Sequence, residues 1–468
     1  MHTNDEQQLP VAVLGAGPVG LAAAAHLIER GLSPMVLEAG PAVGANLATY
    51  RHVRLFSPWQ YNIDKAARRL LQAQGWHAPA DDALPTAGEL LDDYLAPLAA
   101  TSAIAASLRL GHRVTAVTRL GFDKVKTRGR EGAPFLIRVE TAEGPRQYLA
   151  SAVIDATGTW SHPNPLGADG IPALGEAALA ARIDYGMPDV LGAAREHFAG
   201  RRVLVVGAGH SAAGVLLALA QLAKDHRGTS IVWATRGSQL ARVFGGGAAD
   251  GLQARGQLGM RLKALRDAGG LALHENFRID ELLEVEGRIH VLGEARDGVT
   301  PVIEGIDRIV CAAGARPDLA LTRELRVRHD PWLESTDALA PLIDPNEHSC
   351  GTVRPHGHRE LAHPEPGYYA VGAKSYGRAP NFLMATGYEQ VRSVVAALAG
   401  EMEAADEVQL DLPETGVCNT RLAYEKAVTE PAACCDVPAA AAASCCVPAP
   451  APSGACGCSK PASVGCCA

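Results

Sequence analysis

Residues 9–38 of this chain are LPVAVLGAGPVGLAAAAHLIERGLSPMVLE. An apolar run, Val11 to Leu14, leads into the motif Gly15-Ala-Gly17-Pro18-Val-Gly20, and an alanine-rich stretch follows it. A second apolar run then ends at Glu38. This order predicts a strand, a glycine turn, a helix and a second strand, which together form the β-α-β unit typical of dinucleotide binding.

Each residue of this motif has a separate physical task. Gly15 permits the tight turn, Gly17 lets a pyrophosphate approach the backbone, and Gly20 allows the helix to pack on the strand. The helix that begins near Pro18 offers N–H groups and the positive end of its dipole to phosphates. Glu38 can accept hydrogen bonds from ribose hydroxyls. The alternative is a glycine turn that serves only packing.

The pattern recurs in residues 201–236, RRVLVVGAGHSAAGVLLALAQLAKDHRGTSIVWATR. Here Gly207, Gly209 and Ser211 occupy the turn, and the second strand is followed by Arg236 in place of an acid. A carboxylate would repel a 2′-phosphate, whereas a guanidinium can bind it with two hydrogen bonds. The second site is therefore predicted to prefer NADPH, unless Arg236 is a solvated surface residue.

Composition excludes several classes of function. The chain has 468 residues and a formal net charge of −8, so no broad basic surface is expected for nucleic acid. No uncharged apolar run reaches the roughly 20 residues of a membrane span, and the first ten residues are polar. We expect a cytoplasmic protein with a small-molecule substrate and reduced thiols.

The cysteines are concentrated at one end of the sequence. The first of the 11 is Cys311, and eight lie in the last 40 residues or so: Cys434, Cys435, Cys445, Cys446, Cys456, Cys458, Cys466 and Cys467. Adjacent thiols can chelate a thiophilic centre such as As(III), Hg(II) or Cu(I), whereas a zinc module favours regular C-x-x-C spacing. From Glu430 the composition predicts a disordered tail, whose thiols either bind metal or are incidental.

Over about residues 9–400, the arrangement resembles the two-dinucleotide flavoproteins. The segments that carry the likeness, besides the two glycine motifs, are Asp155-Ala-Thr157-Gly158, Ala312-Ala-Gly314-Ala-Arg316-Pro317 and Tyr369-Ala-Val-Gly372. The resemblance implies an α/β fold with two Rossmann-like domains, FAD at the first motif and NADPH at the second. Where this family commonly has Gly-Asp, the chain has Gly372-Ala373.

The resemblance also implies domain boundaries. An FAD-binding domain would cover residues 9–160 and return over 331–403, with an NADPH-binding domain inserted at 161–330 and a tail at 404–468. The residues implied to bind the cofactors are Gly15, Gly17, Pro18, Gly20, Glu38, Trp59, Val114, Thr157, Gly158, Gly207, Gly209, Ser211, Arg236 and Gly372.

Three kinds of flavoprotein fit the motifs to different degrees. Disulfide reductases of this superfamily carry a cysteine pair near the first motif or a C-x-x-C in the NADPH domain, and this chain has neither. Residues 84–95 and the Trp59 segment resemble parts of flavin monooxygenases, although their F-x-G-x-x-x-H fingerprint is missing, with Leu204 in place of the His. The whole layout is similar to flavoproteins encoded with bacterial arsenic-resistance genes, which implies a trivalent arsenical or another thiophilic species as substrate.

A cluster of histidines and one cysteine precedes the returning strand and supplies the catalytic candidates. His348, Cys350 and His356, with His358 and His363 beyond them, are placed to line the substrate side of the flavin or to form a surface loop. The adjoining segment from Lys374 to Arg378 either binds an anion or is solvated.

The sequence leaves the reaction open. A monooxygenase-like reaction in metalloid detoxification is the first interpretation. A reductase of a thiol-bound metal or disulfide is the second, and a metal-binding or sensing protein on a flavoprotein scaffold is the third. The oligomeric state is also open, with a homodimer as one candidate.

Overall fold

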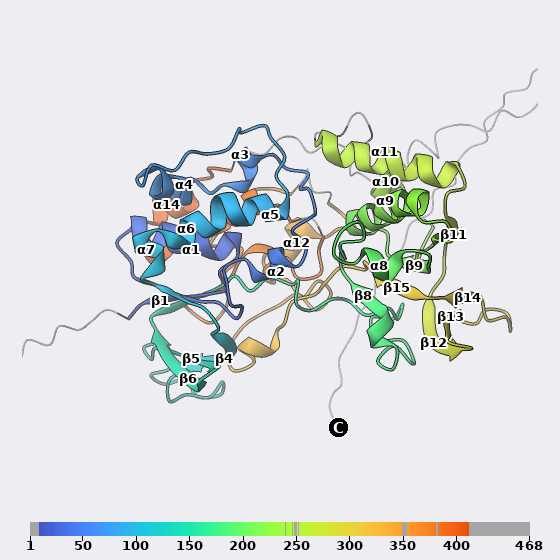
Figure 1. Ribbon diagram of the computed structural model, residues 1–468. Helices are drawn as coiled ribbons and strands as arrows, with labels where there is room; N and C mark the ends of the chain where they lie inside the picture. Colours follow the sequence, from blue (N-terminus) through green and yellow to red (C-terminus); the bar gives the residue numbers. More distant parts are fainter. Residues whose placement is uncertain are drawn as a thin grey trace, which may run out of the picture. The chain divides into compact units, whose positions relative to one another are not determined.

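The fold is described from a computed structural model (Figure 1). The structure describes residues 9–238, 240–245, 247, 250, 252–348, 353–380 and 382–410. The predicted cysteine tail and Cys350 lie outside the described residues.

The first of two parallel sheets contains the first glycine motif. Its five strands run in the order β16-β7-β1-β2-β3, and every neighbouring pair is parallel. The strands are β1 (Val11–Leu14), β2 (Pro34–Leu37), β3 (Leu108–Arg109), β7 (Ala152–Asp155) and β16 (Tyr368–Ala370). The strands β1 and β7 are buried on both faces, which explains their unbroken apolar runs.

The second parallel sheet contains the second glycine motif. Its order is β11-β10-β9-β15-β8, again with every pair parallel. The strands are β8 (Ile183–Tyr185), β9 (Arg202–Val206), β10 (Ser230–Ala234), β11 (Ala272–His274) and β15 (Arg308–Cys311). All of them fall between β7 and β16 in the sequence, so the second sheet is inserted into the first. The predicted α/β fold with two Rossmann-like units is confirmed, while the predicted domain boundaries stay predictions.

Two antiparallel sheets of three strands accompany the parallel ones. The first is formed by β4 (Arg113–Arg119), β5 (Phe135–Thr141) and β6 (Gly144–Ala150), and the second by β12 (Ile279–Val285), β13 (Arg288–Gly293) and β14 (Val302–Ile306). The sequence predicts strands over residues 113–118 and 134–140, which correspond to β4 and β5, but none of the other four. In β6, β12 and β14 the buried positions are few or irregularly spaced, so periodicity gives little signal. β13 does alternate regularly between buried and less buried residues, but it is only six residues long.

Helices cover the sheets. The longer ones are α1 (Pro18–Glu29), α4 (Lys65–Gln72), α9 (His210–Asp225), α11 (Gln253–Asp267) and α13 (Met384–Leu398). The shorter helical segments are α2 (Ala45–Ala48), α3 (Trp59–Asn62), α5 (Ala87–Leu90), η1 (Leu91–Leu95), α6 (Ala96–Ala100), α7 (Ser102–Ala105), η2 (Ala180–Arg182), α8 (Arg195–Phe198), α10 (Ala241–Phe244), η4 (Ala320–Thr322), α12 (Ala340–Ile343), η5 (Gly372–Lys374) and α14 (Met402–Asp406). α1 packs against α4 and α13, and α9 packs against α11.

The sequence predicts a helix over residues 87–100, and this helix is present with one irregularity. α5 and α6 are joined by the π-helical turn η1, in which Tyr94 is fully buried. An extra residue in a helix re-aims the side chains that follow it, which periodicity does not reveal.

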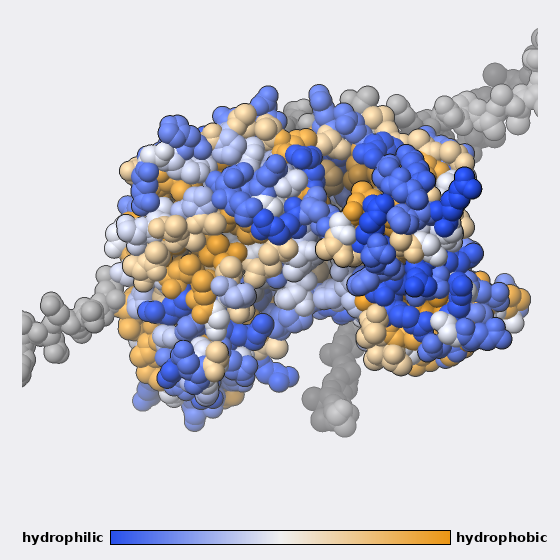
Figure 2. Space-filling view, viewed as in Figure 1, coloured by the Kyte–Doolittle hydropathy of each residue, from blue (hydrophilic) through white to orange (hydrophobic). Residues whose placement is uncertain are grey.

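Helix α11 presents a polar face in the view of Figure 2, which shows mainly hydrophilic residues along it. No helix within the described ranges has both the length and the apolar character that crossing a bilayer requires.

Candidate active site

The first glycine turn has the shape that a dinucleotide needs. Gly15 has a φ of +95°, and a Cβ at Gly20 would lie only 2.0 Å from the carbonyl oxygen of Gly15. A Cβ at Gly17, by contrast, would have no atom within 4 Å. Gly15 and Gly20 are therefore required by the turn and the packing, while Gly17 leaves open space at the start of α1.

The start of α1 is also chemically suited to an anion. Gly17 is its N-cap residue and provides no capping side chain, and Pro18 occupies the first turn. The first N–H groups of the helix thus lack a side-chain acceptor. A pyrophosphate placed beside Gly17 would accept hydrogen bonds from them.

Glu38 lies at the end of β2 and is 9% exposed. One carboxylate oxygen accepts the N–H of Ala16 at 2.7 Å, and the other accepts the N–H of Gly40 at 2.7 Å. These two bonds fix the carboxylate beside the glycine turn. Each oxygen keeps a lone pair with which it could accept a ribose hydroxyl.

The second glycine turn repeats this geometry. Gly207 has a φ of +132°, and a Cβ there would lie 2.3 Å from the carbonyl oxygen of Ala312. A Cβ at Gly209 would have no atom within 4 Å, and Gly209 caps α9 without a side-chain hydrogen bond. Ser211 lies in the first turn of α9, so the second turn also presents an open helix start.

Arg236 follows β10 and lies on the surface. Its Nη1 donates to the carbonyl oxygen of Ala168 at 3.2 Å. Among the described residues, no carboxylate forms an ion pair with Arg236. Its positive charge is therefore not neutralised by an acidic partner there and is available to a phosphate.

The segment from Asp155 to Gly158 lies directly against the first turn. A Cβ at Gly15 would lie 2.9 Å from the carbonyl oxygen of Ala156 and 3.4 Å from the Cα of Thr157. Gly158 has a φ of +68°, which turns the chain away after β7. The role of Thr157 and Gly158 at a cofactor stays a prediction.

A buried ion pair joins this segment to the loop after β16. Lys374 Nζ lies 2.7 Å from Asp155 Oδ2 and donates to Thr157 Oγ1 at 3.0 Å. Burial alone would raise the pKa of Asp155, but the Lys374 ammonium and the Thr157 hydrogen bonds outweigh burial and lower it. The sequence placed Lys374 at an anion site or in solvent and gave no sign of this pairing.

Two of the predicted flavin contacts lie within well-packed elements. Trp59 begins α3 and is 4% exposed, as part of the core around α1. Val114 lies in β4, paired with Val139 of β5. Their role at a flavin stays a prediction.

The two catalytic candidates within the described residues, His348 and His356, have different partners. His356 is buried, with Nδ1 2.9 Å from the carbonyl oxygen of Arg354 and Nε2 2.9 Å from Gln390 Nε2. Burial lowers the pKa of His356. His348 instead contacts the carbonyl oxygen of Pro341 at 2.9 Å. Both ring nitrogens of His356 are thus engaged, which suits positioning of Gln390 better than proton transfer to a substrate.

Cys311 is buried at the end of β15. Its Sγ donates to the carbonyl oxygen of Asn164 at 3.4 Å, and burial raises the pKa of the thiol to about 12. Such a thiol stays protonated and unreactive at neutral pH. Within the described part of the chain, no group of three or more His, Cys, Asp or Glu residues could hold a metal ion.

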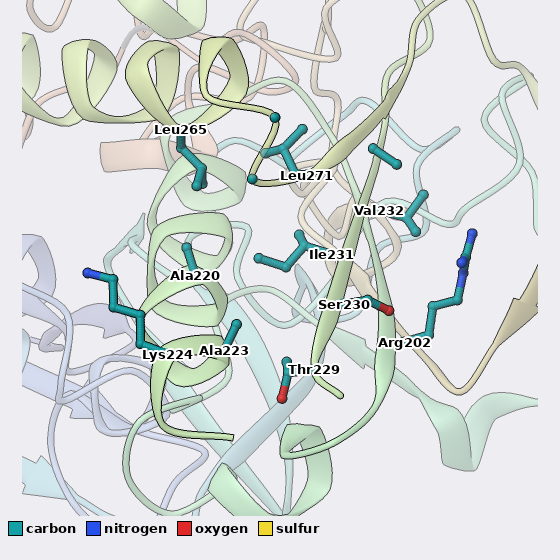
Figure 3. Close-up of a pocket in the computed structure, with 13 residues that line it drawn as sticks. Arg202, Ala220, Ala223, Lys224, Thr229, Ser230, Ile231, Val232, Leu265 and Leu271 are labelled. Atoms are coloured by element: carbon teal, nitrogen blue, oxygen red, sulfur yellow. The ribbon is translucent and has the colours of Figure 1, made fainter. Parts of the chain in front are cut away.

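A depression of about 500 Å³ lies at the amino-terminal ends of the strands of the second sheet (Figure 3). It is lined by the first residues of β9 and β10, including Arg202 and Ser230, and by Ala220 and Lys224 of α9. Dinucleotides bind at the carboxyl ends of parallel strands, where Gly207 lies. This depression is therefore separate from the second glycine turn.

Two parallel sheets in one chain, each with an open glycine turn at a helix start, define an α/β protein with two dinucleotide sites. The chain belongs to the pyridine nucleotide-disulphide oxidoreductase family, which matches residues 12–350. It is an oxidoreductase that uses FAD and a nicotinamide dinucleotide. A search of curated proteins gave no match.

Solved structures of both reductases and oxygenases share the fold. The bacillithiol disulfide reductase Bdr of Bacillus cereus aligns with a TM-score of 0.62 and 18% identity, over 84% of this chain and 100% of its own. The cadaverine monooxygenase DfoA of Erwinia amylovora, bound to FAD, aligns with a TM-score of 0.61 and 14% identity, over 86% and 97%.

A third structure carries both kinds of cofactor. The ornithine N-hydroxylase KtzI of Kutzneria sp. 744, with reduced FAD, NADP+ and L-ornithine, aligns with a TM-score of 0.56 and 16% identity, over 85% of this chain and 100% of its own. At these identities the likeness establishes the fold and does not separate a reductase from an oxygenase.

Proposed function

We propose that this chain is an FAD-dependent, NADPH-consuming oxidoreductase of the monooxygenase type, acting in the cytoplasm on a trivalent arsenical or another thiophilic small molecule. FAD would bind at the turn of Gly15, Gly17 and Gly20, with Glu38 on its ribose. NADPH would bind at the turn of Gly207 and Gly209, with Arg236 on its 2′-phosphate. The open space beside Gly17 and Gly209 supports both assignments.

The observation that carries the monooxygenase assignment concerns thiols. A disulfide reductase needs a reactive thiol pair at the flavin, and the chain has no cysteine before Cys311. Cys311 itself is buried and its thiol has a raised pKa. Electrons that reach the flavin therefore have no thiol acceptor among the described residues.

The chain's own groups would bind and orient the two nucleotides. FAD held at the first turn would supply the transfer of two electrons from NADPH to an oxidant. The start of α1 would hold the pyrophosphate. The start of α13 carries the positive end of the helix dipole, which would stabilise negative charge on a reduced flavin.

The proposal of a thiophilic substrate rests on the terminal cysteines. Paired thiolates such as Cys434-Cys435 and Cys445-Cys446 favour soft centres, of which As(III) is one. We propose that these thiols gather the substrate for oxygenation, in which O2 is the oxidant and NADPH supplies the two electrons that reduce the second oxygen atom to water.

A reductase is the second candidate, because the fold is shared with a bacillithiol disulfide reductase. In that case the terminal cysteines would accept the electrons directly or would hold a metal that accepts them.

Oxygen uptake separates the two candidates. NADPH oxidation, oxygen consumption and hydrogen peroxide release should be measured together with arsenite, organic trivalent arsenicals and sulfur compounds. A monooxygenase should consume one O2 per NADPH and yield an oxygenated product, with peroxide suppressed by the true substrate. NADPH oxidation that proceeds equally well without oxygen, given only a disulfide or metal acceptor, would contradict the proposal.

A further inference from the structure

Stability of the fold does not by itself explain why Lys374 and Asp155 form a buried ion pair. The side chains are 2% and 0% exposed, and the two groups lie 2.7 Å apart. The desolvation cost of such a pair is commonly as large as the attraction between its charges, so apolar residues of similar size would serve a core at least as well. We therefore look for the function of this ion pair in the segments of the chain that it holds in place.

The pair joins two segments that border the first glycine turn from different sides. Asp155 ends β7, and Lys374 Nζ also donates to Thr157 Oγ1 at 3.0 Å, next to the backbone that contacts Gly15. Gly372, in the same loop as Lys374, has a φ of +67°, and a Cβ there would lie 3.3 Å from Val19 Cγ2 in the first turn of α1. The ion pair thus spans the turn where α1 begins.

A second set of hydrogen bonds holds the loop from its other side. Gln390 Oε1 accepts the N–H of Gly372 at 2.7 Å, and Gln390 Nε2 donates to Ser375 Oγ at 2.9 Å. His356 contacts the same amide at 2.9 Å. With α13 fixing one side, Lys374 and Asp155 set the distance between the loop and the glycine turn.

We propose that Lys374 is a positioning residue for FAD: through Asp155 and Thr157 it holds residues 372–375 against the first glycine turn and so shapes the flavin site. The inference rests on the proposed binding of FAD at that turn. Lys374 would act through Asp155 and Thr157 and would not itself touch the cofactor.

The test measures FAD affinity of the apoprotein, by flavin fluorescence, alongside thermal unfolding. Lys374→Met should raise the Kd for FAD at least about tenfold and also lower Tm, because Asp155 stays buried without a counter-charge. The double variant Asp155→Leu with Lys374→Met should regain part of the Tm, because no charge is left uncompensated, although the hydroxyls of Thr157 and Tyr368 lose their acceptor. It should still bind FAD at least about tenfold more weakly. The gain in Tm without a gain in affinity is the signature of positioning.

Arg255→Met is the matched control. Arg255 and Asp250 form an ion pair whose side chains are 4% and 0% exposed, outside the first sheet. This variant should lose stability as Lys374→Met does, with the Kd for FAD within about twofold of wild type.

The outcomes distinguish the two proposals. If the wild type does not bind FAD at all, the proposed function fails. If the wild type binds FAD and the double variant binds it equally well, only the role of Lys374 is refuted. If neither variant folds, the rate of amide hydrogen exchange in the wild type, measured with and without FAD, tests the role of Lys374. FAD should then slow exchange in residues 371–376, and unchanged exchange there would refute the inference.

Discussion

Gly17 is the residue at which one substitution should separate cofactor binding from folding. A side chain at this position meets no atom within 4 Å, and an aspartate is a favourable N-cap residue for α1. The same carboxylate would stand where the pyrophosphate is expected. Gly17→Asp should therefore abolish the bound flavin and its yellow colour while leaving the Tm of the apoprotein close to that of wild type.

Gly209→Asp is the control for this prediction. Gly209 also has open space and also caps its helix without a side chain. This variant should keep FAD and lose reduction by NADPH. A Gly17→Asp protein that retains flavin, after FAD has been added back to the wild type as a check, would contradict the assignment of the first site.

Arg236 is the residue that we expect to decide between NADPH and NADH. A 2′-phosphate contact is worth on the order of 1.4 kcal/mol or more, so we expect a preference for NADPH over NADH of at least about tenfold. Arg236→Ala should narrow the ratio mainly by raising the KM for NADPH. Arg278→Ala is a suitable control, because Arg278 is already paired with Asp169 and Glu294. An unchanged ratio in Arg236→Ala would exclude it as the phosphate ligand.

At the scale of the element, the connection into β16 contains a buried histidine whose protonation opposes folding. His363 accepts the N–H of Arg328 through Nδ1 at 3.2 Å, and its buried Nε2 has no hydrogen-bond partner among the described residues. Burial, followed by the charge of His329, lowers the pKa of His363 from 6.5 to about 4. The rings of His329 and Tyr368 lie 5.3 and 5.5 Å from it.

The sign of the pH dependence follows from this lowered pKa. Below pH 6.5 the unfolded chain binds a proton at His363 that the folded chain does not, so stability falls with pH down to about 4. The shift corresponds to a loss of about 3 kcal/mol in the free energy of unfolding. His363→Phe should flatten the decline between these two pH values, measured by urea unfolding, whereas the exposed His197→Gln should not. Equal slopes for the wild type and His363→Phe would contradict the prediction.

For the whole molecule, the described residues up to 410 contain both parallel sheets and their cores. Deletion of residues 430–468 should therefore leave the flavin content, the Tm and the rate of flavin reduction by NADPH close to wild type. The same deletion removes eight thiols and should abolish most high-affinity binding of As(III), measured by calorimetry.

Replacement of the eight cysteines by serine in the full chain is the matched control. It should reproduce the loss of As(III) binding without shortening the protein. If the truncated protein binds As(III) as tightly as the full chain, the terminal cysteines are not the site. If it loses flavin or unfolds, residues 430–468 contribute to the fold.

The sequence by itself determined the two glycine turns, the strands and helices around them and the α/β class. These features are each marked within a short stretch of sequence: the glycines with positive φ at Gly15 and Gly207, the unbroken apolar run of a strand buried on both faces, and the acid that follows β2. Such contacts leave a local pattern that periodicity and turn chemistry reveal.

Only the tertiary structure decided the rest of the site. Lys374 bonds to Thr157 across 217 residues of sequence, and His356 contacts Gln390 across 34, so neither pairing leaves a local pattern. An isolated lysine or histidine in a polar loop is compatible with solvent, with a substrate or with a buried partner. The desolvation of the side chain and the charge beside it decide among these environments. For Lys374, both arise only when the strands β7 and β16 lie side by side.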